Sequence, residues 1–193
     1  MPTNQVSPSG IWLPLITPLR DGRLDETSLR RMIGHYAAQP VDGLILAATT
    51  GEGLTLEHEE QERLVAETAD SLAAIGRKLP VYLGLSGSNT RHVVRAAEQA
   101  AAWPIDGYLI ACPYYSRPSQ AGLYHHFKTL AGSTEQPILI YNIPYRTGVN
   151  LLNETMLRLA GGDGMSAVPR QPDASDIAAM LALNNMFAAE TSR

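Results

Sequence analysis

The stretch Gly43-Leu44-Ile45-Leu46-Ala47-Ala48-Thr49-Thr50-Gly51-Glu52-Gly53 decides the fold of this chain. Its first half is a short apolar run of the kind that forms a buried strand in a parallel sheet. Its second half is a glycine-containing turn, and residues 56–75 then follow with the spacing of a helix. The stretch therefore opens one strand, loop and helix unit.

The same unit recurs with a period of roughly 30 residues, which is the length of a βα repeat. Apolar runs predict strands at 11–17, 44–48, 81–85, 108–111, 138–141 and 165–168. Helical spacing predicts helices at 25–38, 56–75, 89–103, 119–131, 153–160 and 174–189. Helix start signals are present at Asp25, Thr55, Asn89, Ser119 and Asn153. We therefore predict an α/β protein with a parallel sheet.

Two architectures use this unit, the doubly wound sheet and the (β/α)8 barrel. A doubly wound sheet carries a glycine-rich phosphate turn after its first strand, whereas Thr17-Pro18-Leu19-Arg20-Asp21-Gly22 follows here. A barrel gathers polar side chains where its strands end. Such residues end the apolar runs: Thr17, Thr49, Thr50, Glu52, Ser86, Ser88, Tyr114, Tyr115, Tyr141 and Asn142. We predict one domain over residues 1–193 of the (β/α)8 TIM-barrel type, incomplete because it has about six βα units.

The composition excludes several classes of protein. With 15 Lys and Arg against 19 Asp and Glu, the net charge of −4 offers no basic surface for nucleic acid. The apolar runs are far shorter than the roughly 20 residues of a membrane span, and the N-terminus lacks the features of a signal peptide. We therefore expect a cytoplasmic protein without a membrane partner. The single cysteine, Cys112, excludes an internal disulfide, and the histidines lack metal-ligand spacing, so no metal or other cofactor is predicted.

Three motifs carry side chains suited to chemistry. In Thr49-Thr50-Gly51-Glu52, hydroxyls and unpaired N–H groups favour a carboxylate or phosphate, although the same residues also suit a capped turn. A tyrosine of Pro113-Tyr114-Tyr115 can relay a proton, or the pair can pack at a surface. Arg146, in Tyr141-Asn142-Ile143-Pro144-Tyr145-Arg146, can bind both oxygens of a carboxylate or form a rim salt bridge.

Taken together and in order, these motifs resemble those of the dihydrodipicolinate synthase and N-acetylneuraminate lyase superfamily. The resemblance covers about residues 10–160 and also includes Gly10-Ile11-Trp12, Thr17-Pro18, Arg117-Pro118-Ser119-Gln120 and Arg146-Thr147-Gly148. It implies a (β/α)8 barrel, usually a homotetramer, that binds pyruvate as a Schiff base on a lysine. Such a barrel then adds or removes an aldehyde.

The paired threonines and Arg146 are similar to the synthase branch, a lyase that condenses pyruvate with aspartate semialdehyde on the route to lysine. By this resemblance, Thr50, Tyr115 and Tyr141 form a proton relay. Thr49 and Thr50 contact the carboxylate of pyruvate, and Arg146 holds the carboxylate of the semialdehyde. In one version of the family pattern the tyrosine that crosses from a neighbouring subunit corresponds to Tyr114, so Tyr114 joins the substrate-binding residues.

The Schiff-base lysine is not where the resemblance places it. Counting from Arg146 by the family's separation leads to Pro169, which has no free amine. The two lysines of the chain, Lys78 and Lys128, are expected before the third strand and in the middle of an outer helix, where neither reaches the relay. A truncation, a frameshift or a degenerate paralogue would explain this and the divergence after about residue 163, and we favour truncation.

Three functions remain open. The first is a synthase-like lyase, active or descended from one. The second is a non-catalytic protein that binds keto acids or assembles with other copies. The third is an N-acetylneuraminate or 2-keto-3-deoxy-sugar aldolase of the same superfamily, against which Arg146 counts. The expected partners are pyruvate or another small keto acid, an aldehyde and further copies of the chain.

Overall fold

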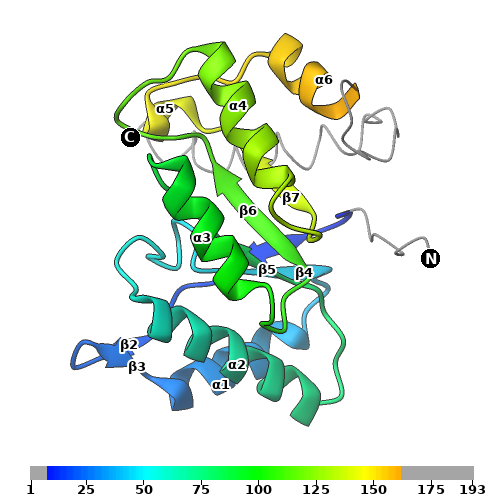
Figure 1. Cartoon of the computed structure of the whole chain (residues 1–193). Helices are drawn as coiled ribbons and strands as arrows, with labels where there is room; N and C mark the ends of the chain where they lie inside the picture. The colour runs from blue at the N-terminus through cyan, green and yellow to red at the C-terminus, as the bar shows by residue number, and fades with distance from the viewer. Residues whose placement is uncertain (1–7, 162–193) are drawn as a thin grey trace, which may run out of the picture.

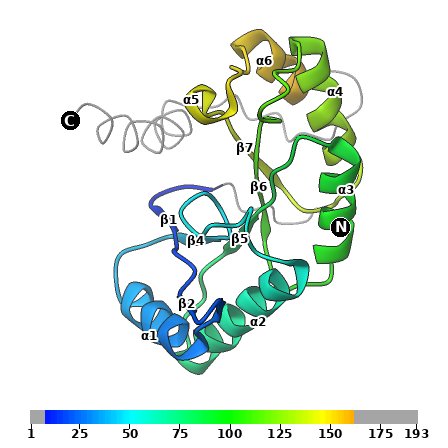
Figure 2. The ribbon, with the colours of Figure 1, turned by 90° about the vertical axis from the view of Figure 1, so that its left-hand side faces the viewer.

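The structure is a computed structural model that describes residues 8–161 of the chain. In this part a five-stranded parallel sheet has the order β1-β4-β5-β6-β7. Its strands are β1 (Trp12–Pro14), β4 (Gly43–Leu46), β5 (Val81–Gly84), β6 (Gly107–Ala111) and β7 (Ile138–Tyr141). Each strand pairs with its successor, without the reversal of a doubly wound sheet. The predicted barrel-type fold is confirmed as a curled half-barrel (Figure 2).

Helices connect the strands and follow one another around the outside of the sheet (Figures 1 and 2). They are α1 (Glu26–Ala37), α2 (His58–Ala74), α3 (Thr90–Ala100), α4 (Gln120–Ala131), α5 (Pro144–Thr147) and α6 (Asn153–Gly161). Right-handed crossovers put successive connecting helices on one face of a parallel sheet. Neighbouring helices pack on each other, α1 on α2, α3 on α4 and α4 on α6. The opposite face of the sheet is left as the inside of the curl.

Strand residues alternate between these two faces, as the pleat requires. Side chains that face the helices enter the main core, and they include Leu44, Leu46, Leu83, Tyr108 and Ile110. The residues between them form a smaller inner cluster, with Ile45, Tyr82 and Leu109 buried. Each large apolar side chain buried in this way contributes about 1.5–3 kcal/mol relative to leaving it exposed. The continuous apolar runs of the sequence reflect burial on both faces of the sheet.

A repeated device closes the amino ends of the strands. Asp42 accepts a hydrogen bond from the Ile11 N–H at 2.7 Å, and Asp106 accepts one from the Val81 N–H at 2.8 Å. The glycine after each aspartate leaves room for an aromatic ring of the neighbouring strand, Trp12 over Gly43 and Tyr82 over Gly107. The two rings meet edge to face with centroids 4.7 Å apart. Neither Asp-Gly pair was predicted to have this role.

Most predicted helix starts are confirmed. The side chains of Asp25, Asn89 and Ser119 accept hydrogen bonds from backbone N–H groups in the first turns of α1, α3 and α4. The predicted start at Thr55 is wrong, because α2 begins at His58 with Glu57 as its N-cap. Glu60 accepts a hydrogen bond from the Glu57 N–H at 2.9 Å, while the Thr55 hydroxyl bonds back to the Glu52 carbonyl. The threonine thus closes a turn and leaves the helix to start later.

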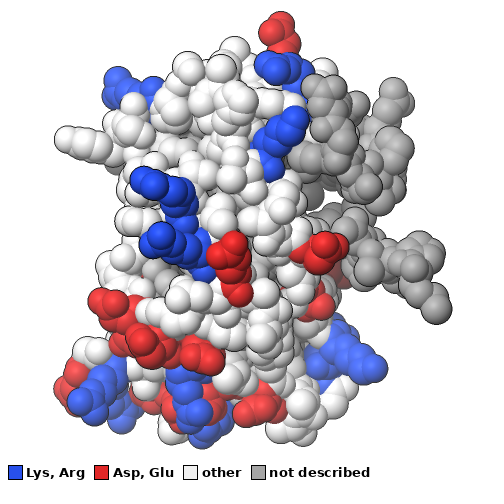
Figure 3. Space-filling model, viewed as in Figure 1, with Lys and Arg blue, Asp and Glu red and all other residues white. Residues whose placement is uncertain are grey.

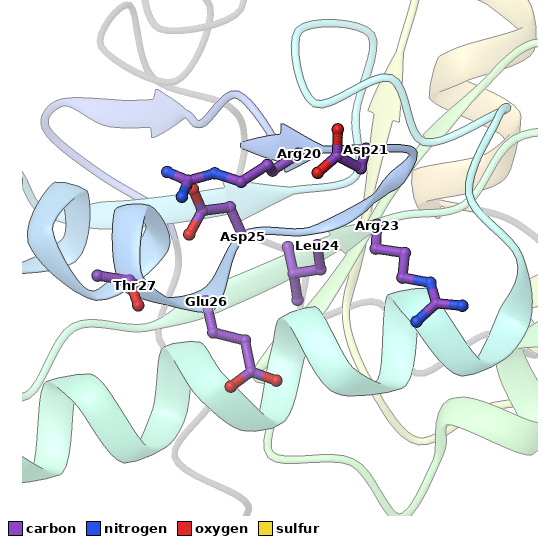
Figure 4. Close-up of a pocket in the computed structure, with 7 residues that line it drawn as sticks. All are labelled: Arg20, Asp21, Arg23, Leu24, Asp25, Glu26 and Thr27. Atoms are coloured by element: carbon purple, nitrogen blue, oxygen red, sulfur yellow. The ribbon is translucent and has the colours of Figure 1, made fainter.

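A small hairpin interrupts the segment between β1 and α1. Strands β2 (Leu19–Arg20) and β3 (Arg23–Leu24) pair antiparallel around Asp21 and Gly22, whose φ angles of 52° and 74° suit a two-residue hairpin turn. The Arg20 guanidinium lies 2.7 Å from the Asp25 carboxylate that caps α1 (Figure 4). The sequence prediction missed this hairpin, although Asp-Gly is its usual signal.

Acidic and basic side chains are mixed over the two helices at one end of the molecule. Figure 3 shows acidic and basic side chains interspersed over α1 and α2. Among them, the buried Glu67 carboxylate lies 2.6 Å from Arg30 and 2.7 Å from Arg63. Both arginines also contact Glu26 of α1. This network ties the two helices together at their solvent face.

Parts of the sequence prediction fall outside the described residues. These are the strand at 165–168, Pro169 and the helix at 174–189. Among the helices that the structure describes, none is long and apolar enough to cross a bilayer.

Candidate active site

A cavity of about 1300 Å³ opens where β4, β5, β6 and β7 end. Five of the predicted site residues line it: Thr49, Tyr114, Tyr115, Tyr141 and Arg146. They come from three different loops, and the curl of the sheet brings them to one place. Thr50 is half-buried and is not among the lining residues. The three predicted motifs therefore meet at the carboxyl ends of the strands, the position typical of chemistry in this fold.

The turn after β4 holds Thr49 in a tightly folded backbone. Ala47 has a φ of 50°, in the left-handed region that few side chains adopt. The Ala47 carbonyl lies so close to Gly53 and Gly84 that a Cβ at either position would overlap it. From the segment that follows β1, the Thr17 hydroxyl donates a hydrogen bond to the Gly51 carbonyl at 2.7 Å. Thr17, which ends the first predicted strand, thus supports the threonine turn.

Tyr141 ends β7 and is half-buried at the cavity. Burial raises the pKa of its phenol, because the charged form loses hydration. The positive charge of Arg146 and a hydrogen bond with Thr49 lower that pKa, but burial outweighs them. The phenol is therefore protonated at neutral pH and can both donate and accept a hydrogen bond. Tyr141 therefore lies close to both Thr49 and Arg146, and all three line the same cavity.

The two adjacent tyrosines differ in their surroundings. Tyr114 is half-buried, and its carbonyl accepts a hydrogen bond from the Ser88 hydroxyl at 2.7 Å. Tyr115 is 94% exposed and has a φ of 69°, an uncommon conformation for an aromatic residue. Its ring therefore extends into solvent at the rim of the cavity. Ser86 and Ser88, which end the third predicted strand, connect β5 to the β6 side of the cavity.

Arg146 lies on α5, a helix of four residues. Its side chain is exposed, and its guanidinium carbon is 5.6 Å from the centroid of the Tyr145 ring. The helix ends at Gly148, whose φ of 72° is the left-handed conformation usual after a helix. A guanidinium at the rim can bind both oxygens of a carboxylate that enters the cavity.

Neither lysine of the chain lies at the cavity. Lys78 is exposed in the segment between α2 and β5, at the amino end of the sheet. Lys128 lies on α4, with its ammonium 3.3 Å from the Tyr124 hydroxyl and 5.4 Å from the ring centroid. Both positions agree with the sequence prediction. Pro169, the residue at the predicted lysine position, lies outside the described residues.

The cavity also includes a wall that the sequence prediction missed. His58 and Gln61 of α2 line it together with His92 of α3. Gln61 donates a hydrogen bond to the Gly53 carbonyl at 3.1 Å, and the His58 ring packs on Trp103 with centroids 5.0 Å apart. None of the three was predicted to belong to the site. Their position could have indicated the site, because each lies near the start of a helix that follows the carboxyl end of a strand.

Other candidate groups do not contribute to this site. Cys112 is buried, and burial raises the pKa of its thiol to about 11, so it is not a thiolate nucleophile. Within residues 8–161, no three His, Cys, Asp or Glu side chains come together as metal ligands. A second cavity of about 570 Å³ lies beside the hairpin and is lined by the Arg20 and Asp25 ion pair (Figure 4). None of the predicted site residues lines that cavity.

Comparison with known proteins places these features in a family. The model of the "Dihydrodipicolinate synthetase family" matches residues 7–183. Two relatives are 4-hydroxy-tetrahydrodipicolinate synthase 2 of Clostridium acetobutylicum, 40% identical over 159 residues, and 4-hydroxy-tetrahydrodipicolinate synthase of Syntrophus aciditrophicus, 42% identical over 151 residues. They are matched over 82% and 78% of this chain but only 54% and 51% of their own lengths, so the chain spans about half of each relative.

A solved structure agrees with these relatives. The 4-hydroxy-tetrahydrodipicolinate synthase from Methylacidiphilum fumariolicum SolV superimposes with a TM-score of 0.75 at 36% identity. The superposition covers 80% of this chain and 50% of that chain. The predicted family resemblance is therefore confirmed, and the chain belongs to the dihydrodipicolinate synthetase family.

Proposed function

We propose that the cavity recognises pyruvate and a carboxylate-bearing aldehyde, as the substrate-binding part of a dihydrodipicolinate synthase-like lyase. The observation that carries this proposal is the meeting of Thr49, Tyr141 and Arg146 at one cavity. Hydroxyls, a protonated phenol and a guanidinium suit two small carboxylates, those of pyruvate and of the aldehyde. They suit less well the pairing of pyruvate with a neutral sugar aldehyde. Aspartate semialdehyde is the aldehyde that the synthase resemblance implies, and a sugar aldolase is disfavoured for the same reason.

In this proposal each side chain has a separate task. The Thr49 hydroxyl holds the pyruvate carboxylate, together with backbone N–H groups of the turn that contains Thr49 and Thr50. Thr50, Tyr115 and Tyr141 form the relay that carries protons to and from the reacting oxygen. Arg146 binds the carboxylate of the aldehyde through two parallel hydrogen bonds, and Tyr114 shapes the cavity wall beside it.

The covalent step needs an amine that the described cavity lacks. A Schiff base forms when a neutral lysine attacks the ketone of pyruvate and water leaves. None of the residues lining the cavity is a lysine, and Lys78 and Lys128 both lie elsewhere. This observation favours a second candidate, a keto-acid-binding protein that does not form the covalent intermediate with its own residues.

Binding should depend on the two carboxylate contacts separately. We expect Thr49→Val to lower the affinity for pyruvate about tenfold, because a hydrogen bond to a charged group is lost. For the same reason, Arg146→Ala should lower the affinity for succinate semialdehyde, a simple carboxylate-bearing aldehyde, by a similar factor. Isothermal titration calorimetry on the purified chain measures both. Arg95→Ala is the matched control, because Arg95 is exposed on α3 and does not line the cavity. Equal affinities in all variants would contradict the proposal.

Borohydride reduction in the presence of pyruvate separates the two candidates. We expect no covalent adduct by intact-mass spectrometry, because both lysines are far from the cavity. An adduct mapped to Lys78 or Lys128 would contradict their exclusion from the chemistry. Pyruvate binding without an adduct favours the non-covalent candidate for this chain.

The proposal also includes a cytoplasmic location and a homo-oligomeric state, a tetramer in the form that the family resemblance implies. Support comes from the solvent-exposed Tyr115 at the cavity rim, which a second copy would cover. Light scattering coupled to size-exclusion chromatography measures the mass of the assembly.

A further inference from the structure

The helix that presents Arg146 is too short to hold itself. α5 spans Pro144–Thr147, and an isolated single turn is unstable in water because nucleating a helix is unfavourable. Its backbone bonds run from the N–H groups of Arg146 and Thr147 to the Ile143 carbonyl, both at 3.0 Å. The position of the guanidinium therefore depends on contacts from outside α5.

Asn142 supplies the contacts that close the segment. Its amide oxygen accepts a hydrogen bond from the Leu151 N–H at 3.0 Å. Its amide nitrogen donates to the Asn150 side chain at 2.9 Å and to the Leu151 carbonyl at 3.2 Å. One side chain at the end of β7 thus fastens the far end of residues 143–151 to the strand that carries Tyr141. These bonds close the segment at its base, and α5 with Arg146 lies within it.

Gln120 fastens the same segment to α4. Its amide nitrogen donates to the Asn150 carbonyl at 2.8 Å, and its oxygen accepts from the Leu152 N–H at 3.0 Å. The buried Thr155 hydroxyl of α6 donates to the same oxygen at 2.7 Å. Asn150 is therefore held from two sides, by the strand end and by the first turn of α4.

We infer that Asn142 and Gln120 are positioning residues that hold Arg146 over the cavity and so set the affinity for the aldehyde carboxylate. Neither amide lines the cavity, so each acts only through the 143–151 segment. If these residues only stabilised the fold, their substitution would lower the affinity for pyruvate and for the aldehyde alike, because both ligands need the folded chain. If they position Arg146, their substitution lowers only the affinity for the aldehyde that Arg146 binds. The ligand-binding part of this inference rests on the proposed function.

The test compares Asn142→Ala and Gln120→Ala with Gln136→Ala. Gln136 precedes β7 at its opposite end, where its amide nitrogen donates to the Ile105 carbonyl at 3.4 Å. Calorimetry with pyruvate and with succinate semialdehyde measures the two affinities. We expect Asn142→Ala and Gln120→Ala each to lower the affinity for succinate semialdehyde about tenfold, the scale of one hydrogen bond to a charged group. The affinity for pyruvate should stay unchanged. The Arg146→Ala background should remove this effect.

Amide hydrogen exchange gives a readout that does not depend on any ligand. We expect the N–H groups of Arg146, Thr147 and Gly148 to exchange at least about tenfold faster in Asn142→Ala, and at the wild-type rate in Gln136→Ala. Unchanged exchange, unchanged affinity for succinate semialdehyde, or an equal loss for both ligands overturns the inference. If the wild-type chain binds neither ligand, the proposed function fails, and the exchange rates still decide whether Asn142 orders the loop.

Discussion

Replacing Gly53 with alanine is expected to prevent the chain from folding. A Cβ at position 53 would overlap the carbonyl oxygen of Ala47, and a backbone atom cannot move aside as a flexible side chain can. Ala47 itself already has a φ of 50°, so the turn has little freedom to adjust. We expect a loss of more than about 4 kcal/mol, the range of a severe backbone clash in a core. Urea denaturation followed by circular dichroism, together with the yield of soluble protein, measures this loss.

Gly34→Ala is the matched control for this prediction. Gly34 lies on the exposed side of α1, where an added Cβ meets nothing within 4 Å. Alanine is the better helix former, so we expect this variant to gain about 0.5–1 kcal/mol. A Gly53→Ala protein as stable as the wild type would show that the turn after β4 has a different backbone path.

Acid should destabilise the fold mainly through His126. This residue of α4 is buried, with its Nδ1 2.8 Å from the Thr90 hydroxyl of α3 and its Nε2 without a partner within residues 8–161. Burial lowers the pKa of the imidazole to about 4, because the protonated ring would lose its hydration. The unfolded chain keeps the ordinary value near 6.5. Between these two values, only the unfolded state takes up the proton.

The contribution of His126 to stability is therefore fully present above pH 6.5 and is lost as the pH drops from 6.5 toward 4. The difference in pKa corresponds to a loss of about 3 kcal/mol by pH 4. Asp25 and Glu26 affect stability at lower pH. Hydrogen bonds lower their pKa values from 3.8 and 4.5, so their contributions are lost as the pH falls below these ordinary values. Urea titrations at half-unit pH intervals give the profile.

Two variants isolate the contribution of His126. His126→Phe keeps a ring in the α3–α4 interface and removes the titration, so its stability should change little between pH 6.5 and 5. The neighbouring His125 is exposed on the same helix, and His125→Phe should keep the wild-type slope. A wild-type profile that is flat over this interval would contradict the burial of His126 as a neutral ring.

The residues that meet at the candidate site could be predicted from the sequence, whereas those that support them could not. Thr49, Tyr141 and Arg146 follow apolar runs, and the rule that parallel strands end at one edge was enough to group them. Their supports are Thr17, which bonds to Gly51 34 residues away, and Gln120, which bonds to Asn150 30 residues away. No local pattern encodes such pairs, because an amide or hydroxyl in a loop has many possible partners.

The sequence by itself determined the order of the five sheet strands and of the helices α1 to α4 and α6, since the period of apolar residues is a local property that survives in any tertiary context. It also determined the family, because the motifs recur in order. Only the tertiary structure decided that Gly53 must lack a side chain and that Thr49 rather than Thr50 lines the cavity. It also decided that His126 is buried and that its Nε2 has no partner among residues 8–161. The physical reason is that each of these properties depends on a close approach between segments that are separate in the chain. The curl of the sheet sets that distance, and no pattern of neighbouring residues records it.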